Sequence, residues 1–356
     1  MRPALGEKNH VQCMRDLLVA RIVDGTRPPG APWPSAADLA RESAVSPITA
    51  RRVLALLKRE GLIDLRQGRA ARTAASFSAL PLGGVAAVFV ADYDARRQYG
   101  CDPCQWHFTS ALLRKFGQER QPGLLLPLER WADMASRDAF GALVFVDLAS
   151  RFRSAYAKIP PFGKPYAILH DSGLSGADSN EISFDYAKAV DRAAMNLVVL
   201  GMKRIVIVSC LRPHVEDDIL LASLRRTLAS LDFDLTQIRR CDVPDFFEAS
   251  GQNAMARLIG DGLPRRTAVI TSGDLLARGV IKAGLQRGWH LKKDFVVFGR
   301  SGLPEAARWD PALTTFQQPF TEAALATVTM LKEQRRTGRN QSASRVLPVK
   351  FILRKS

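Results

Sequence analysis

The sequence predicts an α/β protein in two parts, a small helical domain with a hairpin at the N-terminus and a larger body of parallel strands and helices. Helical patterns with start signals fill the first 65 residues. From Val85 onward, short runs rich in Val, Ile and Phe alternate with helical stretches, which is typical of parallel strands buried on both faces. A chain of 356 residues also exceeds what one hydrophobic core usually serves.

The first helix is predicted over 11–23, and the Asp-Gly pair that follows ends it. Its apolar side at helical spacing consists of Met14, Leu17, Leu18 and Ile22. A second, short helix opens at Ser35, because Ser35 and Asp38 have the spacing of a capping box. Only the segment "ESAV" separates this helix from a third, so the pair has the arrangement of a helix-turn-helix.

The third helix is predicted to begin at Pro47 with Ser46 as its N-cap, and Gly61 ends it. One face forms an apolar stripe of Ala50, Val53, Leu54 and Leu57. The opposite face carries Ile48, Arg52 and Arg59, with Arg51 on the flank. Arginine pairs with phosphate and reads guanine, and the first residues of a recognition helix meet the bases, so we expect Thr49, Arg51 and Arg52 to read DNA.

A hairpin, or wing, is predicted over 62–74 with its turn at Gln67-Gly68. It carries Arg66, Arg69 and Arg72, which we expect to meet phosphates. The stretch 74–84 is small, almost uncharged and rich in Gly, Pro and Ser, so it is predicted to be a linker between a domain over 1–73 and a body over 85–356.

The body shows six buried runs: "VAAVFVAD", "GALVFVD", "PYAILHD", "RIVIVSC", "TAVITSGD" and "DFVVFG". Helical stretches at 105–116, 187–200, 217–231 and 275–287 lie between them, which predicts doubly wound parallel sheets. Open α/β sheets bind ligands at the carboxyl ends of their strands. The polar residues at these ends are Asp92, Asp147, Asp171, Ser209 and Asp274.

The net charge bears on the binding partners of the protein, and the cysteine content bears on its cellular compartment. With 51 basic against 35 acidic residues the chain carries +16, which attracts polyanions. Five scattered cysteines and an N-terminus without a signal peptide predict a cytoplasmic protein, and no run of 18 apolar residues suggests a membrane span.

Catalytic and metal-binding interpretations find little support. The segment "CDPCQWH" at 101–107 has two cysteines and His107, but a structural zinc site needs a second such pair, so a loop entering a helix fits better. Neither a nucleophile elbow nor a phosphate-binding glycine loop follows a predicted strand. We therefore expect that the protein is not an enzyme and that it binds neither a metal nor a cofactor.

The first part resembles the winged helix-turn-helix of GntR-type regulators. The matching residues are Pro29-Gly30, Pro34-Ser35, Leu39-Ala40, Val45-Ser46, Thr49, Arg51, Leu57 and Glu60-Gly61-Leu62. Two arginines common in that family are replaced by Ala37 and Pro47, and its Gly-x-Gly wing tip reads Gly68-Arg69-Ala70. The resemblance implies DNA binding through Ser35, Ser46, Thr49, Arg51, Arg52, Arg66 and Arg69, and the replaced arginines leave the operator sequence open.

The body resembles the effector domain of LacI/GalR-type repressors, a bilobed periplasmic-binding-protein-like (type I) fold of two doubly wound sheets. Four segments in order carry the likeness: "FDYAKAVDRAAMNLVVLGMKRIVIVS", "TAVITSGDLLARGVIKAGLQRGWHLKKDFVVFG", "PALTTFQQPF" and "LPVKFILRKS". Leu220, Gly273 and Ser301 stand where sugar-binding relatives carry polar side chains that hold sugar hydroxyls, and only Asp274 is kept.

Together these resemblances imply a dimeric DNA-binding regulator, a repressor by default, that recognises an operator and responds to a small-molecule effector. Effector-binding residues are expected to be Asp92, Trp106, His107, Asp171, Arg212, Asp274, Arg300 and Gln317. Arg212 and Arg300 favour an acidic or otherwise unusual effector, and the loss of three polar side chains predicts weak or no response to neutral sugars. A solute-binding protein of the same fold, an α/β enzyme with an accessory domain, and a regulator with a decayed effector site are the alternatives.

Overall fold

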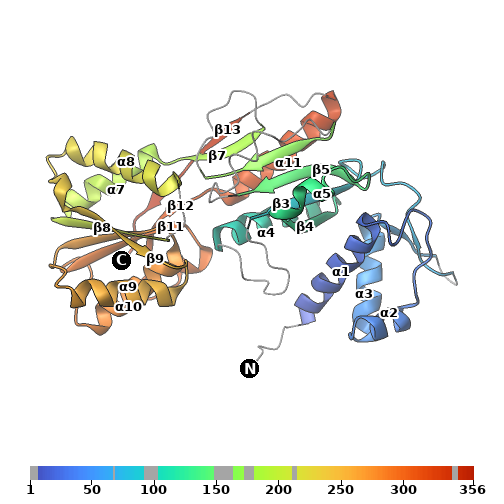
Figure 1. Cartoon of the computed structure of the whole chain (residues 1–356), viewed down its shortest axis with the longest axis horizontal. Helices are drawn as coiled ribbons and strands as arrows, with labels where there is room; N and C mark the ends of the chain where they lie inside the picture. Colours follow the sequence, from blue (N-terminus) through green and yellow to red (C-terminus); the bar gives the residue numbers. More distant parts are fainter. Residues whose placement is uncertain are drawn as a thin grey trace.

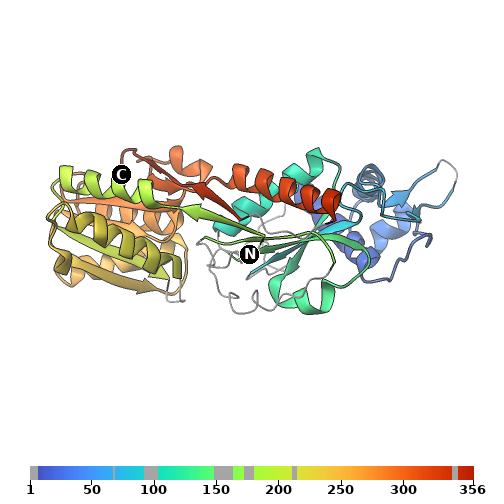
Figure 2. The ribbon, with the colours of Figure 1, turned by 90° about the horizontal axis from the view of Figure 1, so that it is seen from above.

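The computed structural model describes residues 7–66, 69–91, 103–147, 163–171, 180–210, 215–338 and 344–356. Three bodies lie in a row along its longest axis (Figures 1 and 2). We name them the head (residues 7–73), the N-lobe and the C-lobe. The N-lobe lies between the other two, and the chain ends in the C-lobe.

The head consists of α1 (Glu7–Val23), α2 (Ala36–Glu42), α3 (Pro47–Arg59) and the antiparallel pair β1 (Ile63–Asp64) and β2 (Arg72–Thr73). The predicted caps are confirmed: Ser35 Oγ accepts from Asp38 N at 3.2 Å and Ser46 Oγ accepts from Thr49 N at 3.1 Å. Gly61, at a φ of 72°, ends α3, since this left-handed conformation favours glycine.

The apolar stripe of α3 is buried as predicted, and Ile48 on its opposite face is 59% exposed. One expectation for α1 is wrong, because Leu17 is 47% exposed. The buried arc of α1 extends from Met14 and Leu18 towards Val19 and Arg15, and Leu17 lies about 100° away on the other side.

The N-lobe has a six-stranded sheet in the order β13-β7-β6-β5-β3-β4, all parallel. Its strands are β3 (Val85–Val90), β4 (Gly123–Pro127), β5 (Phe140–Val146), β6 (Tyr166–Leu169), β7 (Glu181–Asp185) and β13 (Arg345–Pro348). One face is covered by α4 (Pro103–Gln118) and α11 (Phe320–Thr337). The other face packs against η1 (Leu128–Arg130) and α5 (Trp131–Met134).

The C-lobe sheet has the order β14-β12-β11-β10-β8-β9, and only β14 pairs antiparallel. Its strands are β8 (Arg204–Cys210), β9 (Ile238–Val243), β10 (Thr267–Thr271), β11 (Phe295–Ser301), β12 (Thr314–Gln317) and β14 (Lys350–Ile352). Its helices are α7 (Ala187–Val199) and α8 (Val215–Ala229) on one face, and α9 (Glu248–Gly260) and α10 (Asp274–Gln286) on the other. Short turns η2 (Leu235–Gln237) and η3 (Pro304–Ala307) complete it.

The chain crosses between the lobes after β7, after β12 and between β13 and β14. All six predicted runs are strands and all four predicted helical stretches are helices, so the two doubly wound sheets are confirmed. Among the described residues, none of the helices combines the length and hydropathy that crossing a membrane requires.

Candidate functional site

The exposed surface of α3 and the wing forms one candidate site, which we call the head surface. Arg51 and Arg52 are exposed on α3, and Ser46 and Ser35 cap the N-terminal ends of the two helices of the motif. Thr49 is only 6% exposed, and its hydroxyl lies 2.9 Å from that of Ser46. Its hydroxyl therefore belongs to the cap, and the exposed side chains at the start of α3 are those of Pro47, Ile48, Arg51 and Arg52.

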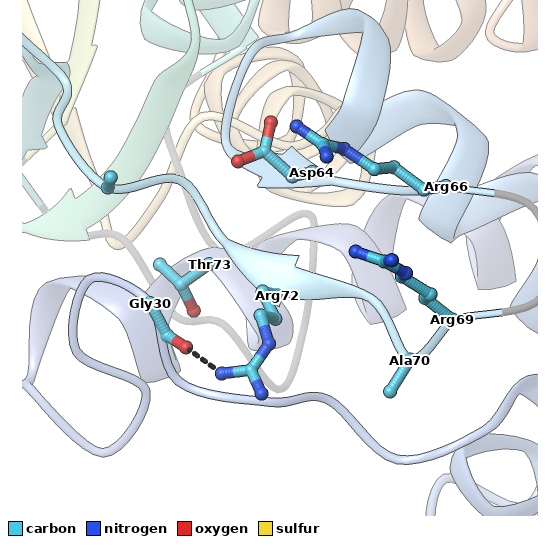
Figure 3. Close-up of a pocket in the computed structure, with 8 residues that line it drawn as sticks. Gly30, Asp64, Arg66, Arg69, Ala70, Arg72 and Thr73 are labelled. Carbon is cyan, nitrogen blue, oxygen red and sulfur yellow. Dashed lines mark hydrogen bonds between the residues drawn. The ribbon is translucent and has the colours of Figure 1, made fainter.

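The wing holds a groove of about 520 Å³ that is lined with arginines (Figure 3). The guanidinium groups of Arg66 and Arg69 reach in the same direction along the hairpin, with Asp64 beside Arg66. Arg72 instead donates to the carbonyl of Gly30 at 2.9 Å and so ties β2 to the loop before α2. Arg66 and Arg69 are thus available to an anionic partner, whereas Arg72 braces the wing; the predicted turn at Gln67-Gly68 lies outside the described residues.

The second candidate site lies between the lobes, where Asp171 and Arg300 meet. Asp171 follows β6 in the N-lobe and Arg300 lies in β11 of the C-lobe. Their side chains are 1% and 9% exposed and form an ion pair. The Asp171 carboxylate also accepts from Tyr186 Oη at 2.6 Å and from Gln318 Nε2 at 2.8 Å. The guanidinium of Arg300 lies over the Tyr186 ring, 5.5 Å from its centroid.

Two of these partners were missed from the sequence, which pointed to Gln317 instead of Gln318. Gln317 is half-buried and lines a cavity of about 430 Å³ beside α4 and the start of α11. Tyr186 and Gln318 each lie at a crossover between the lobes, immediately after β7 and β12. A polar side chain at a lobe crossover is the signal that could have found both, because each crossover segment lies where the two lobes join.

Asp274 is held within the C-lobe. It is 1% exposed, its Oδ2 accepts from Leu303 N at 2.7 Å and its Oδ1 accepts from Thr315 Oγ1 at 2.6 Å. Burial raises the pKa of Asp274 to about 6, although these hydrogen bonds oppose the shift. Both carboxylate oxygens therefore already have partners that support the turn after β11.

Two of the remaining predicted residues, Trp106 and His107, lie side by side in the sequence on α4. His107 is half-buried, its Nε2 lies 3.8 Å from Glu305 Oε1 across the lobes, and burial lowers its pKa. Trp106 is 39% exposed. Asp92 and Arg212 lie outside the described residues. Cys104, from the segment weighed as a metal site, has its Sγ 2.6 Å from Ser301 Oγ, a further contact between the lobes; among the described residues, no three metal-ligating side chains come together.

Comparisons with known proteins agree with both parts of the fold. Residues 12–72 match the family described as bacterial regulatory proteins, gntR family. Residues 194–356 match the periplasmic binding protein-like domain. The first match covers most of the head, and the second runs from within α7 through the rest of the C-lobe and includes α11 and β13 of the N-lobe.

Curated relatives cover parts of the chain. The HTH-type transcriptional regulator MalR of Streptomyces coelicolor is 29% identical over 182 residues, which are 50% of this chain and 52% of the relative. The HTH-type transcriptional repressor PurR of Klebsiella pneumoniae is 31% identical over 112 residues, 32% of this chain and 33% of the relative. The chain thus spans about half of one relative and a third of the other.

Solved structures share the fold at low identity. A LacI family transcriptional regulator from Enterococcus faecium with bound ribose has a TM-score of 0.64 and 18% identity, and the match covers 76% of this chain and 98% of that one. The lac repressor dimer bound to operator and an anti-inducer has a TM-score of 0.63 and 17% identity, with 76% and 93% covered. A complex of the transcriptional regulator CelR with cellobiose has a TM-score of 0.64 and 18% identity, with 88% and 91% covered.

Proposed function

We propose that this chain, which joins a gntR-family head to a periplasmic-binding-protein-like body, is a DNA-binding transcriptional regulator and works as a dimer. The observation that carries the proposal is the head surface, where exposed arginines stand on a capped helix and on the wing beside it. Charged side chains on a helix of this kind enter the major groove, while the wing meets the phosphate backbone. The curated relatives carry names of transcriptional regulators and repressors.

The body is proposed to sense a small molecule between its lobes. The solved relatives of the same fold hold ribose or cellobiose according to their titles. In this chain Arg300, between the lobes, is already paired with Asp171, and both carboxylate oxygens of Asp274 already accept hydrogen bonds. A neutral sugar would have to replace these strong contacts with weaker ones. We therefore infer that an effector, if it acts here, carries an anionic group that competes with Asp171 for Arg300.

A second candidate follows from the same ion pair. A cleft whose charges satisfy one another needs no ligand to stay closed, so the chain could act as a regulator without an effector. Calorimetric titration with sugar acids and with the matching neutral sugars distinguishes the two candidates. A regulator with an anionic effector gives a heat of binding with the acids alone. A regulator without an effector gives none with either. Micromolar binding of a neutral sugar that Asp274→Ala abolishes would contradict both.

The test of DNA binding is selection of duplexes from a random pool by the purified protein, followed by footprinting of the selected duplex. We expect a two-fold symmetric site and an affinity that falls steeply as salt rises, because each phosphate contact releases counterions. Failure to enrich any sequence would contradict the proposal. Turnover of a small molecule by the body would favour the enzymatic alternative.

A further inference from the structure

The head and the N-lobe are in direct contact, and a hydrophobic cluster runs from one into the other. It joins Met14 and Leu18 of α1 with Leu124 of β4, and it continues through Phe89 and Phe145 in the sheet. Figures 1 and 2 both show α1 against the end of the N-lobe that lies farthest from the C-lobe. The head is thus seated on the N-lobe in addition to being connected to it by the chain.

Arg15 lies at the centre of this contact and is 3% exposed. Its Nε and Nη2 donate to the carboxylate of Glu60, at 3.0 to 3.2 Å. Its Nη1 donates to Asp16 Oδ1 at 2.7 Å and to the carbonyl of Gly123 at 2.5 Å. A buried guanidinium is tolerated only when it is paired and hydrogen-bonded, and here all three nitrogens donate.

These partners belong to three different elements. Arg15 comes from α1, Glu60 is the C-terminal cap of α3, and Gly123 begins β4, the edge strand of the N-lobe sheet. One side chain therefore connects the recognition helix of the head to the framework of the N-lobe. A second arginine, Arg137 of the N-lobe, donates to the carbonyl of Val23 at the end of α1 at 3.4 Å.

The segment 74–84 adds to this seating, although the sequence suggests a simple linker there. Phe77 and Leu80 are buried in the shared cluster. Gly84 lies so close to Gly141 that a Cβ on Gly84 would come within 2.5 Å of the Gly141 nitrogen. A connection packed this tightly to the start of β5 cannot swing freely.

We propose that Arg15 is a positioning residue, which fixes the direction of α3 relative to the N-lobe and so sets the separation of the two heads in a dimer. This rests on the proposed function as a dimeric DNA-binding regulator. Each base pair inserted between two half-sites moves one half-site along the DNA and rotates it by about 35°, since a turn has 10 to 10.5 base pairs. A dimer whose heads are held rigidly loses affinity for DNA with such insertions, whereas loosely attached heads can still reach both half-sites.

The first experiment measures the affinity of the intact protein for its selected duplex and for versions with one, two or three base pairs inserted at the centre. We expect the unaltered protein to bind the duplexes with insertions about tenfold or more weakly than the selected duplex. We expect Arg15→Ala to bind all of these duplexes with affinities within about twofold of one another. Arg15→Lys should behave like Arg15→Ala, because an ammonium cannot donate to Glu60 and Gly123 with the same planar geometry. Arg21→Ala is the matched control, since Arg21 pairs with Glu42 inside the head at 3.3 Å.

If Arg15 only stabilised the fold, Arg15→Ala would weaken binding to every duplex by the same factor and leave the preference for one spacing intact. That result would overturn the proposal.

A second readout needs no DNA. Spin labels at Ala55→Cys on α3 and Asp133→Cys on α5, with Cys13 and Cys101 replaced by serine, report the distance between head and N-lobe. We expect a narrow distance distribution that Arg15→Ala broadens and Arg21→Ala does not.

The two readouts separate the possible failures. If no duplex is enriched but Arg15→Ala broadens the label distances, the seating stands and the proposed function fails. If a duplex is enriched and the label distances of Arg15→Ala remain as narrow as those of the unaltered protein, the positioning role is wrong.

Discussion

The arginines of the head surface and the arginine of the site between the lobes differ in exposure and in what they contact. On the head, four arginines are exposed on α3 and the wing: Arg51, Arg52, Arg66 and Arg69. Between the lobes, Arg300 is buried against Tyr186 and paired with Asp171. An exposed arginine contributes little to the stability of the fold and is available to a partner, whereas a buried pair is part of the fold itself. Substitutions in the two regions should therefore affect different properties.

The largest effect is expected from breaking the ion pair in the cleft. Arg300→Leu leaves the Asp171 carboxylate buried without its cation, so the free energy of unfolding should fall by about 3 to 5 kcal/mol. Urea denaturation followed by circular dichroism measures it. Arg300→Leu combined with Asp171→Asn should recover much of this loss, and a single substitution that costs under about 1 kcal/mol would show that the pair is not buried as described.

Asp274, buried in the C-lobe, makes the free energy of unfolding depend on pH. Its pKa is raised in the folded state, so the folded protein prefers the protonated carboxyl. Its contribution is complete below about pH 4 and is lost as pH rises through about 6, which amounts to roughly 3 kcal/mol across that window. Unfolding measured between pH 4 and 7 should show this decline for the unaltered protein and a weaker one for Asp274→Asn. Parallel pH profiles for the two proteins would contradict the assignment.

Arginines on the head should change binding and leave stability nearly unaltered. Arg52→Ala is expected to cost about 1 to 3 kcal/mol on the selected duplex and much less on random DNA, if it reads a base. Arg69→Ala should weaken both duplexes by a similar factor, because phosphate contacts do not depend on sequence. Fluorescence anisotropy measures the affinity of each variant for the two duplexes. An equal loss on selected and random DNA for both variants would show that neither residue reads sequence.

The smallest effect concerns the cap of the recognition helix. Ser46→Ala removes the acceptor for Thr49 N and should lower the free energy of unfolding by about 1 kcal/mol. Ser46→Asp restores a capping oxygen and serves as the control for stability. Thermal unfolding of the three proteins measures the difference, and an unchanged midpoint for Ser46→Ala would indicate that the cap contributes nothing.

Local patterns in the sequence were sufficient to predict most of the fold. The caps at Ser35 and Ser46 and the buried runs of the two sheets depend on neighbouring residues, so the sequence reveals them directly. Arg15 was invisible to the same approach, because its partners Glu60 and Gly123 are 45 and 108 positions away. The Asp171–Arg300 pair shows the same limit: both residues were predicted to bind an effector, and the fold places them against each other.

A structure of the intact protein on its selected duplex tests the central claim most directly. The account predicts α3 in the major groove, with Arg51 and Arg52 at base edges and the wing arginines Arg66 and Arg69 against phosphates. It also predicts that the Arg15 contacts to Glu60 and Gly123 are kept on DNA. DNA bound to another surface of the chain, with α3 turned away from the groove, would contradict the account.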